Sequence, residues 1–244
     1  MLQRLLGHLY RGLRYVEPLA FYARHPSFLR FLLKRRHEDP QHIFREAWRW
    51  AKAGRLRMFR RRVFYGIPAE RVLHHNLRYH IKWLFPGFAA EIEPLSEAEI
   101  SLFRAKPSVV VIEHSKCEYA LCAALDAWGI HSALMMRAPY VQSEIAVYKF
   151  NTRPSVIGYS PSTFIQARTA LRAGAVVLGY VDYMHGNTEL VSPAIFSFAK
   201  RTRSQLLFGR VDISDDGRMR CVFKLPKASG EDDLMTELRA FNRH

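Results

Sequence analysis

Residues 109–118 read Val-Val-Val-Ile-Glu-His-Ser-Lys-Cys-Glu, four consecutive β-branched residues that run into a polar segment. A short apolar run of this kind predicts a buried strand over 108–113, and the mainly apolar stretch that follows predicts a helix over 118–128. In α/β sheets, functional groups collect at the carboxyl ends of strands. His114 and Glu118 are therefore the first candidates for a functional site.

The sequence after this segment alternates between strand-like and helix-like stretches. Such alternation predicts an α/β fold with a mainly parallel or mixed central sheet flanked by helices. The expected helices are 118–128, 160–172, 193–202 and 229–244, and the expected strands are 108–113, 132–136, 175–181, 205–213 and 219–225. The last two strands are joined by Ser214-Asp215-Asp216-Gly217, where Asp-Gly is a strong signal for a hairpin turn.

The sequence before residue 80 has a different character. It contains eighteen Lys and Arg against five Asp and Glu, a net charge of +13 out of +15 for the whole chain. Apolar residues recur there at spacings of three and four, the pattern of amphipathic helices. We expect two parts: a basic amphipathic helical N-terminal region over 1–80, packed on or attached to the core, and an α/β core over 81–244.

Three roles are open for the basic region: a solvated helical surface, a contact with anionic lipid, or binding to nucleic acid. Indole rings settle at the membrane interface, so Trp48, Trp50 and Trp83 favour lipid slightly. The sequence shows no known nucleic-acid-binding motif, which makes nucleic acid the least favoured partner. Because no apolar stretch is long enough to span a bilayer, we expect a cytoplasmic protein on the inner face of the cell membrane.

The three cysteines, Cys117, Cys122 and Cys221, form neither an even set nor a metal-type spacing. This argues against a disulfide framework and a metal site, and it favours a reducing compartment. We expect no cofactor.

His114 and Glu118 are four residues apart, a spacing that brings both to one helix face or together across a tight turn. A neutral imidazole can remove a proton from a hydroxyl group, and a carboxylate on its other nitrogen fixes the tautomer and stabilises the imidazolium. On spacing alone, the same pair also fits an ordinary surface His and Glu.

Further segments accompany this pair in a specific order. They are Met-Arg-Ala-Pro at 136–139, Ala-Leu-Arg-Ala-Gly-Ala-Val-Val at 170–177, Asp182, Pro-Ala-Ile-Phe-Ser-Phe-Ala-Lys at 193–200 and Asp-Asp-Gly-Arg at 215–218. With these blocks, residues 109–225 resemble the bacterial lipid A late acyltransferases, a branch of the lysophospholipid acyltransferase superfamily. The resemblance implies transfer of a fatty acyl group from a thioester donor, acyl carrier protein or acyl-CoA, to a hydroxyl or amine of a lipid or lipid-like acceptor.

The resemblance also implies roles for residues. His114 would deprotonate the acceptor, Glu118 would orient His114, and no metal would take part. The family places four residues between its histidine and carboxylate, whereas this chain has three. If the carboxylates are aligned, Glu113 takes the histidine's place; if the histidines are aligned, Tyr119 takes the carboxylate's place. A relative that binds an acyl chain, a carrier or a partner protein without catalysis is therefore an alternative.

Four further residues are candidates for the site. Arg137 matches the family's arginine after the second strand and could hold a phosphate bidentately, and Arg153 is a second candidate of the same kind. Asp182 corresponds to the family's residue at a strand end, although a turn-forming Asp would also explain it. Cys117 offers a different mechanism, in which its thiol is the nucleophile and His114 the base; a buried packing cysteine is the alternative.

Overall fold

Strand β1, Ser108–Ile112, is buried along its whole length. It lies inside a six-stranded sheet, between β4 (Val176–Tyr180) and β7 (Gln205–Ile213). This explains its continuous β-branched sequence, because a strand covered on both faces has no solvent side that needs polar residues. The computed structural model describes residues 18–54, 69–113, 117–136, 145–185 and 188–242; within these, only the backbone of 182–185 and 188–191 is described.

The sheet has the order β3-β2-β4-β1-β7-β8. Strands β2 (Ser132–Met136) and β3 (Ser155–Gly158) run parallel to β4 and β1, and so does β7. Only β8 (Met219–Lys224) is antiparallel, as the second arm of a hairpin with β7. The predicted α/β class with a mainly parallel, mixed sheet is confirmed.

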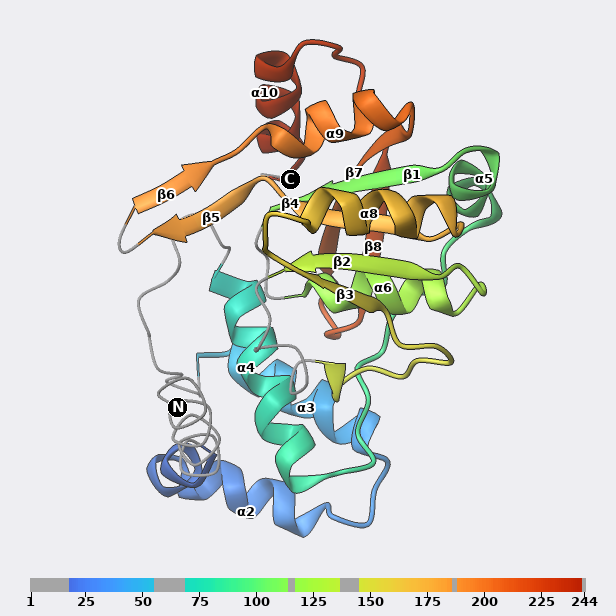
Figure 1. Cartoon of the computed structure of the whole chain (residues 1–244). Coiled ribbons are helices and arrows are strands. Elements are labelled where there is room, and N and C mark those ends of the chain that lie inside the picture. The colour runs from blue at the N-terminus through green and yellow to red at the C-terminus, as the bar shows by residue number, and fades with distance from the viewer. Residues whose placement is uncertain (1–17, 55–68, 114–116, 137–144, 186–187, 243–244) are drawn as a thin grey trace, which may run out of the picture.

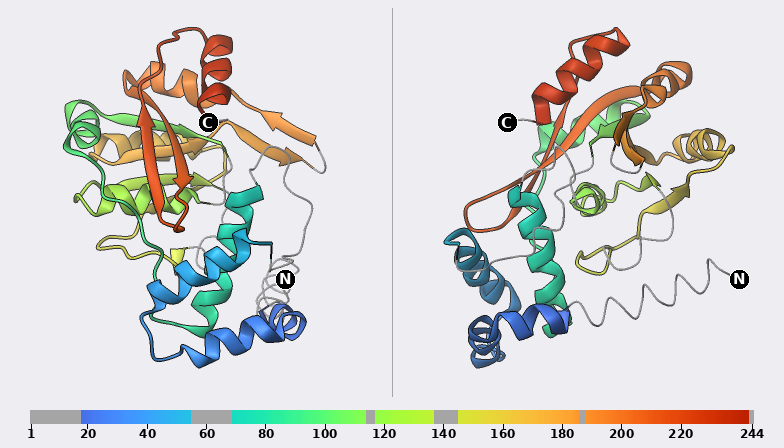
Figure 2. Two further views of the ribbon diagram at one scale, coloured as in Figure 1. Left: turned by 180° about the vertical axis from the view of Figure 1, so that it is seen from behind. Right: turned by 90° about the vertical axis from the view of Figure 1, so that its left-hand side faces the viewer.

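Helices cover both faces of this sheet (Figures 1 and 2). α5 (Glu97–Ala105) and α6 (Glu118–Asp126) share one apolar cluster with the sheet. α8 (Thr163–Arg172), α9 (Ala194–Thr202) and α10 (Glu231–Asn242) share the cluster of the other face. The core is therefore two layers of side chains, one on each side of the sheet.

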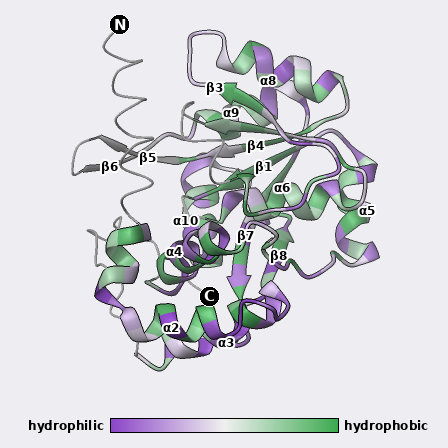
Figure 3. Ribbon diagram, turned by 90° about the horizontal axis from the view of Figure 1, so that it is seen from below, coloured by the Kyte–Doolittle hydropathy of each residue, from purple (hydrophilic) through white to green (hydrophobic). Residues whose placement is uncertain are grey.

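A group of helices lies at one end of the sheet (Figure 1). It comprises the helical residues 18–24, α2 (Pro26–Lys34), α3 (Pro40–Lys52) and α4 (Ala69–Leu84), which bury a third apolar cluster between them. The helices are amphipathic, and Figure 3 shows hydrophobic and hydrophilic residues alternating along α2 and α3. Residue 80 lies within α4, which therefore continues across the expected division of the chain.

The helical group contacts the sheet through the β7–β8 hairpin. Gly217 sits in the turn with φ +84°, and a Cβ there would lie 2.9 Å from Cδ1 of Trp48 on α3. The Nε2 of His74, on α4, is hydrogen-bonded to the carbonyl oxygen of Gly217 at 2.7 Å. The Asp-Gly turn was predicted because glycine adopts the positive φ that such a turn requires. In the structure the same turn also contacts α3 and α4 of the helical group.

The predicted strand bounds agree with the structure more closely than the predicted helix starts. β2 and β7 have the predicted bounds, while the helix expected over 160–172 begins at Thr163, whose hydroxyl bonds the backbone of Ser160. Four described elements were not predicted: α5, the short edge strand β3, and the two strands of a hairpin, β5 (Asp182–His185) and β6 (Thr188–Val191). Across the described ranges, no helix is long and apolar enough to cross a membrane.

Candidate functional site

The carboxyl ends of β1 and β4 lie side by side in the sheet. Ile112 and Tyr180, the last residues of the two strands, are paired in register, and the Val181 N–H donates to the Ile112 carbonyl at 3.3 Å. β2 is the other neighbour of β4 and ends at Met136. The segments that carry Glu118 and Asp182 therefore leave the sheet at the same edge, where functional groups of parallel sheets gather.

The structure does not describe every residue that was predicted to belong to the site. His114 and Arg137 lie outside the described residues. For Asp182 the backbone alone is described; it begins β5, directly after Val181. The described backbone next to these residues, at the ends of β1, β2 and β4, lies at one edge of the sheet.

Glu118 is the first residue of α6 and is 5% exposed. A carboxylate in the first turn of a helix is favoured by the helix dipole, which offsets part of the cost of burying the charge. The next residue, Tyr119, is also buried and donates its hydroxyl to the sulfur of Met136 at 2.9 Å. Of the two residues that could fill the family's carboxylate place, Glu118 supplies an acid and Tyr119 packs in the core beside β2.

Arg78 is a part of this neighbourhood that sequence analysis missed. It lies on α4, is only 1% exposed, and its guanidinium donates to the hydroxyl of Tyr148 and to the Sγ of Cys117, the latter at 3.3 Å. Cys117 is the N-cap of α6 and directly precedes Glu118. A signal existed in the sequence: Arg78 lies between His74 and Ile81 at helical spacing, on the apolar face of α4.

The pKa of the buried Tyr148 hydroxyl depends on the charged groups around it. Burial raises the pKa of Tyr148 far above its ordinary value; the positive charge of Arg78 opposes this shift, and Cys117 and Glu118 add to it. Arg78, Cys117 and Glu118 therefore all lie close enough to Tyr148 to act on it electrostatically. Tyr148 stays protonated, and its hydroxyl accepts from Arg78.

The three cysteines are all buried, and none of them forms a disulfide. Burial raises the pKa of Cys122 to about 12 and that of Cys221 well above its ordinary value, so neither is a useful nucleophile near neutral pH. Cys117 is as deeply buried as the other two but has the guanidinium of Arg78 beside its sulfur. A neighbouring cation favours the thiolate form of a cysteine, whereas complete burial restricts the access of a substrate.

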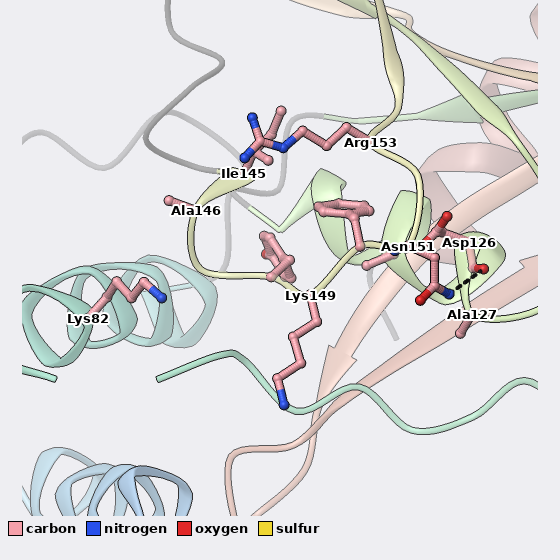
Figure 4. Close-up of a pocket in the computed structure, with 11 residues that line it drawn as sticks. Lys82, Asp126, Ala127, Ile145, Ala146, Lys149, Asn151 and Arg153 are labelled. Carbon is pink, nitrogen blue, oxygen red and sulfur yellow. Dashed lines mark hydrogen bonds between the residues drawn. The ribbon is translucent and has the colours of Figure 1, made fainter. Parts of the chain in front are cut away.

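A cavity of about 750 Å³ lies along α6, between that helix, α4 and residues 145–153 (Figure 4). Its lining includes Arg153, a predicted phosphate ligand. Arg153 precedes the amino end of β3, which is parallel to β2, so it lies toward the opposite sheet edge from the start of α6. The structure therefore does not bring Arg153 to the edge that carries Glu118; it places Arg153 in the cavity.

No group of three or more His, Cys, Asp or Glu side chains that could hold a metal ion occurs within the described ranges. No protein-family model matches the chain, and no curated protein matches it.

Proposed function

We propose that this protein is an acyltransferase that moves a fatty acyl group from a thioester donor to a hydroxyl or amine of a lipid or lipid-like acceptor. The donor would be acyl carrier protein or acyl-CoA. The observation that carries the proposal is Glu118, a buried carboxylate on the first turn of α6, after a central parallel strand and four residues from His114. A carboxylate held in this way suits the role of orienting an imidazole.

In the proposed reaction, one ring nitrogen of His114 takes the proton of the acceptor hydroxyl or amine. The acceptor atom attacks the thioester carbonyl carbon, and a new C–O or C–N bond forms. The C–S bond then breaks, and the departing thiolate takes the proton from the imidazolium. Glu118 stabilises that imidazolium and fixes its orientation, so no further reactant is needed.

A second mechanism is favoured by the contact between Arg78 and Cys117. In it the Cys117 thiolate attacks the thioester carbonyl carbon, the C–S bond of the donor breaks, and the donor thiolate leaves and takes up a proton. The acceptor then attacks the acyl-enzyme, its proton passes to His114, and the Cys117 thiolate is released. The contact at 3.3 Å supports the thiolate, while the burial of Cys117 argues for a packing role. A protein that binds an acyl chain or carrier without catalysis is the remaining alternative.

The test compares three variants with wild type by mass spectrometry of acylated products, using lipid extracts as acceptors and acyl-CoA or acyl carrier protein as donors. With His114 as base, we expect His114→Ala to lose about 10²- to 10⁴-fold in turnover. Glu118→Gln should lose less, because it keeps the shape but not the charge. Cys117→Ser should retain most activity.

Intact mass after addition of donor without acceptor separates the two mechanisms. An acylated wild type together with an inactive Cys117→Ser variant would establish the cysteine route instead. If all three variants turn over like wild type, the chemistry takes place elsewhere in the chain. If wild type transfers no acyl group from either donor, the non-catalytic alternative replaces the proposal.

We also propose that the protein works on the inner face of the cell membrane as a peripheral protein. Three large apolar side chains of the helical group are exposed, namely Leu19 at 56%, Leu33 at 47% and Trp83 at 37%. The rings of Tyr22 and Trp83 lie 6.1 Å apart, which places residues 18–24 beside the end of α4. Exposed cations accompany these side chains, as is typical of interfacial helices; they are Arg24, Arg30 and Lys34.

A further inference from the structure

The cavity beside α6 has cations on its rim. Lys149 and Arg153 are exposed, and in the described part of the chain neither forms an ion pair. Lys82 enters from α4 and is held in place because its ammonium group donates to the carbonyls of Pro86 and Phe88, at 2.6 and 2.7 Å. Figure 4 shows Lys82 and Arg153 on different sides of the same space. Unpaired cations around a cavity attract an anionic ligand.

The acid in the lining, Asp126, offsets only part of this charge, because it is one carboxylate against three cations. Asp126, the last residue of α6, accepts from the backbone N–H groups of Asn151 and Thr152, the second at 2.8 Å. These hydrogen bonds hold residues 151–152 against the end of the helix. Asp126 therefore shapes the cavity and leaves a net positive charge available to a ligand.

The rest of the lining is largely apolar. Ala123 of α6 and Ala127, which directly follows the helix, line the cavity together with Ile145, Tyr148 and Phe150. An inorganic anion would make no favourable contact with these apolar side chains. A ligand that carries an anionic group on an organic chain would contact the cations and the apolar side chains together. We propose that this cavity binds a phosphate ester, with Lys149 and Arg153 holding the phosphate, Lys82 as a fixed third charge, and the organic chain lying along α6.

One wall of the cavity is connected to the candidate active site. Tyr148 lines the cavity and accepts from Arg78, which also donates to Cys117 beside Glu118. The first and last residues of α6 are about 12 Å apart along the helix axis, so an extended substrate could reach from one end to the other. The bound ester is therefore the phosphate-bearing arm of the acyl donor, and this identification of its source rests on the proposed function.

The test measures binding by calorimetry with the full chain and requires no turnover. Coenzyme A represents the donor, and short-chain lysophosphatidic acid below its micelle concentration represents a phosphorylated lipid. The variant Lys149→Gln/Arg153→Gln removes two cations from the cavity. Its matched control, Arg168→Gln/Arg172→Gln, removes two exposed cations from α8, which packs on the other face of the sheet.

We expect wild type and control to bind coenzyme A alike and the cavity variant to bind about tenfold or more weakly, because charge-assisted hydrogen bonds are lost. Ala127→Trp should weaken binding to a similar degree without changing charge, since it fills the space beside α6. Circular dichroism and thermal unfolding verify that each variant is folded.

Each other outcome overturns part or all of the proposal. If only lysophosphatidic acid shows this pattern, the phosphate site stands and its assignment to the donor is refuted. If the cavity variant binds like the control, or if wild type binds neither probe, the cavity is not a phosphate-ester site. If wild type shows the expected binding pattern but transfers no acyl group from either donor, the proposed function is refuted and the cavity assignment stays in place.

Discussion

Arg78 donates a hydrogen bond to the Sγ of Cys117 at 3.3 Å, although the two residues are 39 positions apart in the chain. This contact joins α4 of the helical group to the N-terminus of α6, beside Glu118. Burying a guanidinium is costly unless its donors are satisfied, so the site and the helical group depend on each other through this pair. The helical group is thus part of the structure that holds the candidate active site.

Replacement of Arg78 is expected to destabilise the whole protein. Arg78→Met keeps much of the side-chain volume but leaves the Tyr148 hydroxyl and the Cys117 thiol without their donor. We expect a loss of about 1.5–3 kcal/mol in the free energy of unfolding, the range for hydrogen bonds to a charged group. Urea unfolding followed by circular dichroism measures it.

The control for Arg78 is Arg172→Met, which removes an exposed cation from α8 and should change stability by less than about 0.5 kcal/mol. Arg78→Lys should fall between the two, because it keeps the charge but not the planar arrangement of donors. Equal unfolding midpoints for Arg78→Met and Arg172→Met would show that the buried contact contributes nothing.

Gly217 is expected to tolerate no side chain. Gly217→Ala should be destabilising for two reasons: its φ of +84° disfavours L residues, and the new Cβ would lie 2.9 Å from Trp48. Gly174 has the same φ, but nothing lies within 4 Å of a Cβ there. Gly174→Ala therefore measures the cost of the backbone conformation alone, about 1 kcal/mol.

The difference between these two glycine variants, obtained from thermal unfolding, isolates the packing of α3 on the β7–β8 turn. We expect Gly217→Ala to be the less stable by about 1 kcal/mol or more, as in other overpacked cores. A Gly217→Ala variant as stable as Gly174→Ala would mean that α3 moves away from the turn at no cost.

Stability should fall as the pH is lowered below neutral. Burial, assisted by the charge of His25, lowers the pKa of His80 from 6.5 to about 4, and burial also lowers the pKa of His74. Between pH 6.5 and 4 the unfolded chain binds a proton at His80 that the folded protein does not bind. The stability present above pH 6.5 is therefore lost toward pH 4, by up to about 1.4 kcal/mol per pH unit from His80.

His80→Phe should reduce this dependence on pH, because phenylalanine keeps the stacking on Phe21 and does not titrate. Thermal unfolding between pH 4 and 7 provides the measurement, with exposed His131→Gln as the control that retains the slope. An unchanged slope in His80→Phe would assign the pH dependence to other groups.

Binding to vesicles should require the exposed apolar residues of the helical group. The full chain is expected to sediment with anionic vesicles more than with neutral ones, and less at higher salt. Leu33→Ser/Trp83→Ser should weaken this binding several-fold. The control pair Ile165→Ser/Leu225→Ser removes two apolar side chains of the α/β core that are at least as exposed, and it should not weaken binding. Equal loss in both pairs, or tighter and salt-sensitive binding to duplex DNA, contradicts the membrane assignment.

The sequence by itself determined the fold class and most strand positions of this protein. β1 is recognisable because its β-branched run reflects burial on both faces, and the hairpin turn is recognisable because Asp-Gly meets a local backbone need. β3 was missed because its four residues are half-exposed and carry no clear alternation. Such information is local, since it depends on residues that are neighbours in the chain.

The tertiary structure alone decided which side chains share a site. Arg78 belongs with Cys117, Glu118 and Tyr148 because the fold brings Arg78 of α4 within hydrogen-bond distance of Cys117, and no local pattern encodes a contact across 39 residues. Arg153 follows the second strand in sequence, but the parallel direction of β3 places it in the cavity instead of at the edge with Glu118. Periodicity specifies which face of an element is buried, whereas the partner across that face is set by packing between distant segments.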